Sequence, residues 1–326
     1  MSKLRDIPVM ITGASGFLGS HLVRRLLREG ARVNVLALPD DPRSRLEKLD
    51  GKIRVHPVNI RDETILKRVT GDISPRLIFH LAALTSPERS RSRLASVLAV
   101  NLGGTVNLLR ALDGIKYDKL VCTCTAEAYG KNPPPFREDM ALDPPSPYSL
   151  SKAAATLACR TWANLSGAPI TILRLFLAYG PGQDEDRFIP QLIRAGLTGD
   201  PLRMTAGEQT REFTYIDDVI EGLLLAAQRE TKPGEVINIG SGREISLRGL
   251  VEKVELILGR RVPIHPDTLP YRRNEIWRYV GDHARAASRL GWRPRVPLEE
   301  GLARTVEWYR AQLSKERPSS PGGRTA

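Results

Sequence analysis

The 326-residue chain is long enough to bury one large core or two ordinary ones, and its formal net charge of +12 makes it strongly basic. It contains no run of about 18 apolar residues, and no hydrophobic signal core follows the polar start, so we expect a cytoplasmic protein without a membrane span. The basic charge suits anionic ligands. Because the arginines are spread along the chain without interleaved aromatic residues, we do not expect nucleic acid to be the partner.

The stretch from Val9 to Val23 has the pattern of an apolar strand, a glycine-rich turn and an amphipathic helix. Gly13, Gly16 and Gly19 are spaced G-x-x-G-x-x-G, which lets the backbone turn tightly and approach a diphosphate. The free N–H groups and the dipole of the helix would then face this anion. We predict a dinucleotide site here, and the plain alternative is an ordinary glycine-rich turn between a strand and a helix.

Downstream of this turn, predicted strands and helices alternate. We expect strands at residues 9–12, 33–36, 53–58, 77–81, 120–124 and 170–175, and helices at 20–29, 105–112 and 149–166. This order implies an α/β fold with a doubly wound parallel (Rossmann) sheet. We assign residues 1–180 to a dinucleotide-binding domain, to which the chain returns around 212–240, residues 181–313 to a smaller mixed α/β substrate lobe, and residues 314–326 to a flexible tail.

The cysteines have the pattern of core residues. Cys122, Cys124 and Cys159 are an odd number and contain no C-x-x-C pair. Cys122 and Cys124 alternate along a predicted buried strand, as small apolar side chains do. We therefore predict neither a disulfide framework nor a metal site.

A candidate acid–base pair follows the fifth predicted strand. Tyr148 and Lys152 are four residues apart and share one face of the next helix. A free tyrosine has a pKa of about 10 and is a poor base at neutral pH, but a nearby ammonium group stabilises the phenolate. We therefore expect Lys152 to lower the pKa of Tyr148, and we expect the hydroxyl of Thr125 to hold the substrate oxygen.

A series of short motifs lies in order along residues 7–310. They are Thr12–Gly19, His80–Ala83, Asn101, Thr125–Gly130, Ser146–Tyr148 with Lys152, Arg174–Phe176, Tyr179–Pro181 and Thr210–Val219. With these motifs the chain resembles the extended short-chain dehydrogenase/reductases of the NAD-dependent nucleotide-sugar epimerase/dehydratase family. The ordered motifs are specific for this family, but they do not identify the substrate.

The resemblance implies that Thr125, Tyr148 and Lys152 are the catalytic set. Tyr148 would take the proton from a sugar hydroxyl, usually at C4, and Lys152 would also hold the nicotinamide ribose. The expected function is an NAD(P)-dependent sugar-nucleotide epimerase that acts through a 4-keto sugar. A nucleotide-sugar 4,6-dehydratase and an NADPH-dependent 4-keto-sugar reductase are the alternatives, and a non-enzymatic cofactor-sensing or RNA-binding protein is a remote one.

The segment Thr125-Ala126-Glu127 bears on the choice among these reactions. Related 4,6-dehydratases commonly have Thr-Asp-Glu or Thr-Ser-Glu here, whereas Ala126 can neither donate nor accept a proton. The alanine weakens the dehydratase reading and favours an epimerase. Glu127 remains a candidate catalytic acid or base, and a structural carboxylate is its alternative role.

The resemblance also implies a set of cofactor-binding residues. Besides Tyr148 and Lys152, they are Gly13, Ser15, Gly16, Phe17, Leu18, Gly19, Asn59, Ile60, Leu81, Ala82, Ala83, Asn101 and Thr123. NAD is the expected cofactor, but NADP is not excluded, because Ala37 stands where NAD-binding relatives usually carry an acid. The aspartates just after it, Asp40 and Asp41, could bind the ribose of NAD, whereas Arg43 and Arg45 could hold the extra phosphate of NADP.

The expected substrate is a nucleoside-diphosphate sugar. The resemblance points to Thr85, to Arg211 and Arg272 as diphosphate clamps, and to Glu275 as a ligand of the nucleotide ribose. Leu177 departs from the family, since many relatives have an asparagine there that touches the diphosphate. The resemblance also implies a homodimer built partly from the helices around 105–112 and 149–166.

Overall fold

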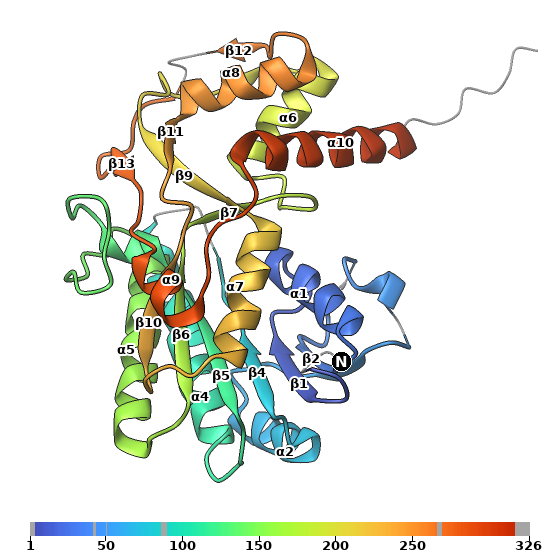
Figure 1. The fold of residues 1–326 in the computed structure, drawn as a ribbon, viewed down its shortest axis with the longest axis vertical. Helices are drawn as coiled ribbons and strands as arrows, with labels where there is room; N and C mark the ends of the chain where they lie inside the picture. Colours follow the sequence, from blue (N-terminus) through green and yellow to red (C-terminus); the bar gives the residue numbers. More distant parts are fainter. Residues whose placement is uncertain (1–3, 42–43, 50, 86–89, 266–268, 317–326) are drawn as a thin grey trace, which may run out of the picture.

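The computed structural model describes residues 4–41, 44–49, 51–85, 90–265 and 269–316, and Figure 1 shows the course of the chain. Arg43 and residues 317–326 of the expected tail lie outside this part. The strands are β1 (Pro8–Thr12), β2 (Arg32–Ala37), β3 (Arg54–Pro57), β4 (Leu77–His80), β5 (Lys119–Thr125), β6 (Ile170–Leu175), β7 (Leu177–Tyr179), β8 (Leu202–Arg203), β9 (Thr210–Tyr215), β10 (Glu235–Ile239), β11 (Glu244–Ser246), β12 (Ile264–His265) and β13 (Arg278–Tyr279). The α-helices are α1 (Phe17–Arg28), α2 (Glu63–Ile73), α3 (Leu94–Val97), α4 (Gly104–Ala111), α5 (Pro147–Ser166), α6 (Phe188–Thr198), α7 (Ile216–Gln228), α8 (Leu247–Leu258), α9 (Ala284–Leu290) and α10 (Leu298–Glu316).

The larger sheet is parallel and has seven strands in the order β10-β6-β5-β4-β1-β2-β3. From the neighbours β1 and β4 the strand order runs outward in both directions. Such a reversal is the switch point at which doubly wound sheets bind ligands, beyond the carboxyl ends of the strands. The predicted doubly wound α/β fold is therefore confirmed.

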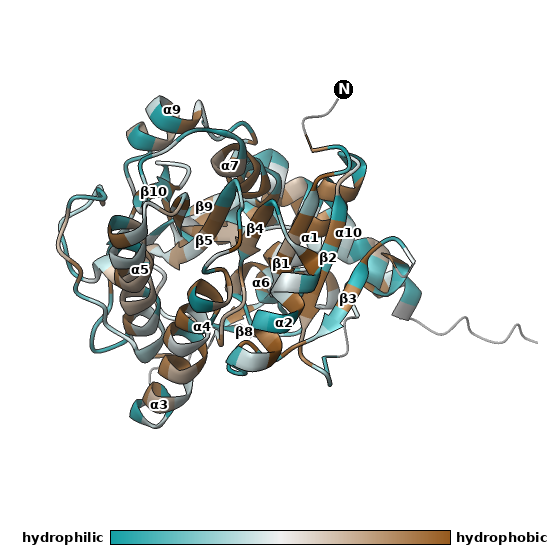
Figure 2. Cartoon of the chain, turned by 90° about the horizontal axis from the view of Figure 1, so that it is seen from below, coloured by the Kyte–Doolittle hydropathy of each residue, from teal (hydrophilic) through white to brown (hydrophobic). Residues whose placement is uncertain are grey.

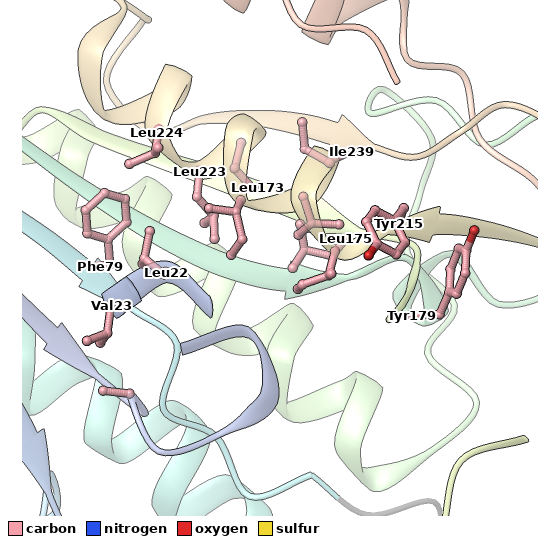
Figure 3. Packing of buried hydrophobic residues seen from close by; sticks show 14 of the residues in the cluster. Leu22, Val23, Phe79, Leu173, Leu175, Tyr179, Tyr215, Leu223, Leu224 and Ile239 are labelled. Carbon is pink, nitrogen blue, oxygen red and sulfur yellow. The ribbon is translucent and has the colours of Figure 1, made fainter. Parts of the chain in front are cut away.

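Each face of this sheet is covered by helices because successive strand residues point to opposite sides. On one face, Ile11 of β1 belongs to a core with Leu22 of α1 and Leu223 of α7, and Figure 3 shows part of this packing. On the other face, Met10 and Cys122 belong to a second core with residues of α2, α4 and α5. All of the cysteines are free and buried, and Cys122 and Cys159 lie with their sulfurs 3.7 Å apart.

The smaller lobe carries two short sheets. One contains β11, β9 and β13, with β7 paired to β9, and the other contains β8 and β12. Helices α6, α8 and α10 lie in this part of the molecule (Figure 1). The chain then passes back through α7, which packs on α1, to β10, which pairs with β6 in the larger sheet.

Three local features differ from the sequence prediction. Helix α2 was not predicted, although its first turn is capped by Asp62, whose side chain accepts a hydrogen bond from the N–H of Ile65. The helix expected at 105–112 is the end of a longer helical stretch that begins at Leu94. In this stretch α3 continues without a break into a π-helical segment and then into α4. The expected tail begins too early, because α10 continues through Glu316.

The stretch from Arg91 to Ala111 is apolar as well as long. Among the described residues it is the one helical stretch whose length and hydropathy would suit a membrane span, and 39% of its apolar 18-residue window is buried. Its buried side chains, such as Val97 and Leu108, pack inside the protein, and it contacts α5. Figure 2 shows the apolar colouring of α3 and α4, and Leu94 of α3 is 39% exposed, so part of this apolar surface is uncovered.

Candidate active site

A cavity of about 1050 Å³ opens beyond the carboxyl ends of the strands of the larger sheet. Its walls include the glycine loop after β1, the ends of β2 to β6, and residues of β9 and β13 from the smaller lobe. It is therefore the crevice that the sheet topology predicts.

The glycine loop requires glycine for steric reasons. Gly13 has φ +73°, and a Cβ there would lie 2.6 Å from the backbone nitrogen of Ala82. A Cβ on Gly19 would overlap the carbonyl oxygen of Gly13. Helix α1 begins after Gly16 with no side-chain cap, and its first turn lines the cavity, as an anion site at a helix N-terminus requires.

A buried chain of hydrogen bonds holds this loop against β4. The N–H of Ala82 donates to Oγ1 of Thr12, which lies 2.7 Å from Nδ1 of His80. Nε2 of His80 lies 2.9 Å from Oγ1 of Thr105, and Thr105 donates to the carbonyl of Asn101. Burial lowers the pKa of His80 to about 3, so the ring is neutral, donates from Nε2 to Thr105 and accepts at Nδ1 from Thr12.

Asn101 was predicted to bind the cofactor, but it is not among the residues that line the cavity. Its side chain is buried and is occupied by hydrogen bonds to both backbone groups of Leu84 and to the hydroxyl of Ser151. It ties the loop after β4 to helix α5. The other predicted cofactor residues all line the cavity: Gly13, Ser15, Gly16, Phe17, Leu18, Gly19, Asn59, Ile60, Leu81, Ala82, Ala83, Thr123, Tyr148 and Lys152.

The predicted catalytic residues Thr125, Glu127, Tyr148 and Lys152 also line this cavity. Thr125 ends β5, and its Oγ1 accepts a hydrogen bond from the N–H of Glu127. Tyr148 and Lys152 lie in the first two turns of α5, which begins sharply with Pro147 and a capping box.

The expected effect of Lys152 on Tyr148 differs from what the structure shows. Burial raises the pKa of the Tyr148 phenol, and its neighbours Cys124 and Glu127 raise it further. The group that lowers it is Arg187, which the sequence reasoning did not single out. Burial also lowers the pKa of Lys152 itself. The residues of this chain therefore favour the neutral phenol of Tyr148.

Glu127 has a defined setting on the cavity wall. Its Oε2 accepts a hydrogen bond of 3.3 Å from Oγ of Ser146, the residue that caps α5. Tyr279 of β13 also lines the cavity, and burial and then the charge of Glu127 raise its pKa, so this phenol stays protonated. Ala126, between Thr125 and Glu127, points away and is buried against Tyr129 and Phe136.

The predicted substrate residues Thr85, Arg211, Arg272 and Glu275 line the cavity as well. Arg211 differs from the expected free clamp, because its Nη2 pairs with Oε1 of Glu275 at 2.5 Å. Its Nη1 donates to the backbone carbonyls of Thr210 and Ile276, both at 2.7 Å. Arg211 and Glu275 thus bind each other, whereas Arg272 is exposed.

The nucleotide end of the cavity is bounded by β2 and β3. Asn59 accepts the N–H of Arg61 at its side-chain oxygen, and Ile60 packs against Gly104, where a Cβ would collide with it. The glycine loop, packed so closely on neighbouring backbone that it admits no Cβ at Gly13 or Gly19, and the uncapped helix start fit a dinucleotide.

Comparison with known proteins agrees with this site. The sequence profile described as "NAD dependent epimerase/dehydratase family" matches residues 9–240. The chain belongs to this family. It is 33% identical to the UDP-glucose 4-epimerase of Mycolicibacterium smegmatis over 92% of this chain and 98% of that protein. It is 32% identical to the UDP-N-acetyl-alpha-D-glucosaminuronate decarboxylase of Bacillus cytotoxicus over 92% and 97%.

Solved structures show the same relationship. The UDP-glucose 4-epimerase of Thermotoga maritima, crystallised with UDP-glucose, superposes with a TM-score of 0.86 at 31% identity, over 94% of this chain and 99% of that one. DesIV of Streptomyces venezuelae, a dTDP-glucose 4,6-dehydratase with NAD bound, gives 0.86 at 30% identity, over 94% and 98%. The family member described here is thus an NAD-dependent enzyme of the nucleotide-sugar epimerase/dehydratase class, as the motifs indicated.

Proposed function

We propose that this family member is a nucleotide-sugar 4-epimerase whose substrate is a UDP-hexose. The supporting observation is that Thr125, Tyr148 and Lys152 line the same cavity as the glycine loop, while Ala126 turns its methyl group into the core. An epimerase needs no proton-transferring side chain at position 126. The UDP-sugar epimerases among the relatives support UDP as the nucleotide.

The chain's own residues divide the work as follows. Tyr148 exchanges a proton with the sugar O4, and Thr125 holds that oxygen. Lys152, in the next turn of α5, holds the nicotinamide ribose. NAD, when bound along the glycine loop, would supply the group that accepts the hydride from C4 of the sugar. Tyr148 would take the proton from O4 as C4 is oxidised and return it to O4 as C4 is reduced, and the raised pKa of its phenol favours the second transfer over the first.

A 4,6-dehydratase is the second candidate, and Glu127 is the observation that favours it. Its carboxylate lines the cavity near Tyr148, where it could remove a proton from C5. The missing acid at position 126 opposes this reaction, since no side chain there protonates the leaving hydroxyl at C6.

Incubation with UDP-glucose in D₂O, without added cofactor, separates the candidates by NMR. An epimerase yields UDP-galactose with no deuterium bound to ring carbons. A 4-keto-6-deoxy product with deuterium at C5 would favour the dehydratase. No conversion of UDP-glucose, together with turnover of a nucleotide-linked 4-keto sugar in a parallel incubation with NADPH, would favour the reductase.

We propose further that the enzyme is a cytoplasmic homodimer that pairs through α3, α4 and α5. The outer face of α5 carries Leu150 and Leu157, which are 40% and 53% exposed, and α3 adds Leu94. Leu150 and Leu157 are seven residues apart and so share one face of α5, and α5 contacts both α3 and α4. Leu157→Asp is expected to give a monomer by light scattering, whereas Leu256→Asp on α8, also at an exposed leucine, is expected to leave the dimer intact. A monomeric wild type would contradict the dimer.

A further inference from the structure

Two groups of opposite charge, Asp41 and Arg45, both contact Ser15 of the glycine loop, near the end of β2. Asp41 lines the cavity, and its Oδ2 accepts a hydrogen bond from Oγ of Ser15, a residue of the glycine loop. Doubly wound folds hold the adenosine ribose of the cofactor here, and a carboxylate binds the ribose hydroxyls of NAD. Asp41 stands four residues beyond Ala37, the position at which the sequence pattern places this acid.

The guanidinium of Arg45 approaches the same Ser15 but is directed elsewhere. Its Nη1 lies 3.4 Å from the carbonyl oxygen of Ser15, its Nε 3.1 Å from that of Gly182, and its Nη2 2.5 Å from Oδ1 of Asp184. The carbonyl of Arg45 in turn accepts a hydrogen bond from Arg24 of α1. All three nitrogens are engaged, and Arg45 is not among the described residues that line the cavity.

This arrangement matters because an arginine at this place would suit NADP. The planar guanidinium matches the 2′-phosphate by which NADP differs from NAD. Of the three groups that hold Arg45, Asp184 is the charged one, and it comes from the loop after β7. The acid that decides where the guanidinium points is thus far from β2 in the sequence.

We propose that Asp184 is a cofactor-selectivity residue, which holds Arg45 out of the cavity and so leaves the carboxylate of Asp41 at the adenosine ribose. NAD is then preferred, because the 2′-phosphate of NADP would meet a carboxylate instead of a guanidinium. This inference rests on the proposed function only in requiring that the cavity binds a dinucleotide.

The same loop offers a matched control. Asp186 also lines the cavity, but it pairs with Arg187 at 3.3 Å. Asp184→Asn and Asp186→Asn therefore remove the same charge from the same loop, and only the former releases Arg45.

The test is calorimetric titration of NAD and NADP into nucleotide-free protein, so that binding is measured without turnover. We expect the wild type to prefer NAD, and Asp184→Asn to bind NADP about tenfold more tightly through the freed charged donor, with little change for NAD. Asp186→Asn should keep the wild-type ratio of the two affinities. In Arg45→Gln/Asp184→Asn the gain for NADP should disappear, which distinguishes the guanidinium from a general loss of negative charge.

Three results would overturn the inference. An unchanged ratio in Asp184→Asn, or an equal gain in the double variant, would show that Asp184 does not act through Arg45. A wild type that prefers NADP would exclude the role of Asp41 while leaving the dinucleotide cavity intact. A wild type that binds neither nucleotide would overturn the proposed function as well.

Discussion

Oγ of Ser146 lies 3.3 Å from Oε2 of Glu127, so the residue that caps helix α5 also contacts the carboxylate on the cavity wall. The same Oγ accepts the N–H of Ser149 in the capping box. The start of the helix that carries Tyr148 and the position of Glu127 are therefore set by one hydroxyl group.

Ser146→Ala removes both contacts. We expect the free energy of unfolding to fall by about 1 kcal/mol, the usual cost of a lost N-cap. Glu127 also loses a hydrogen-bond donor, which should weaken its hold on the cavity wall. Ser146→Thr keeps the hydroxyl and serves as the control in denaturant titrations. Equal stabilities of Ser146→Ala and the wild type would contradict the capping role.

Tyr148→Phe is expected to lower kcat by about 10²- to 10⁴-fold, the range for loss of a general acid–base group. NAD affinity and the melting temperature should change little, because the ring stays in place. The check is steady-state kinetics with UDP-glucose together with NAD titration. Full turnover in this variant would exclude Tyr148 from proton transfer.

Gly13→Ala is expected to abolish NAD binding, because the methyl group would press on the backbone of Ala82 at a residue with φ +73°. Gly114→Ala is the matched control, since Gly114 has φ +78° but nothing within 4 Å of the added Cβ. It carries the same backbone strain without the clash, so NAD titration should show normal affinity. Equal NAD affinities in the two variants would contradict the close approach of the loop.

Glu212 is expected to contribute stability that is lost as the pH rises from about 4.5 to 8, whereas the neutral, buried His80 gives the opposite slope below about pH 6.5. Burial raises the pKa of this carboxyl to about 8, although its oxygens accept hydrogen bonds from the N–H groups of Gly242 and Gly281. In that range the folded chain holds a proton that the unfolded chain has lost, at a cost of about 1.4 kcal/mol per pH unit. In urea titrations the difference in stability between the wild type and Glu212→Gln should shrink as the pH rises through this range, and a difference that does not change with pH would contradict the assignment.

The sequence predicted the parts of this molecule that local rules determine. The glycine spacing, the strand pattern and the Tyr148–Lys152 pair lie within short stretches, and the structure brings them to one cavity. Contacts between distant segments could not be predicted in this way. The pairing of Arg211 with Glu275, the burial that raises the pKa of Tyr148 and the contact of Arg45 with Asp184 each depend on how the smaller lobe folds back.

Sequence reasoning also missed Arg187 and Tyr279. Arg187 directly precedes helix α6. The apolar pattern of a helix says nothing about the role of the residue before it. Tyr279 lies on a two-residue strand, which is too short for a periodic pattern.

The proposed epimerase oxidises C4 of a UDP-hexose and reduces it again in one active site. Incubation of the protein with UDP-[4-²H]glucose, followed by NMR of the products, traces the hydride that leaves C4. We expect UDP-galactose that retains deuterium at C4. Deuterium at C6 of a 4-keto-6-deoxy sugar, or no conversion of UDP-glucose, would exclude this reaction.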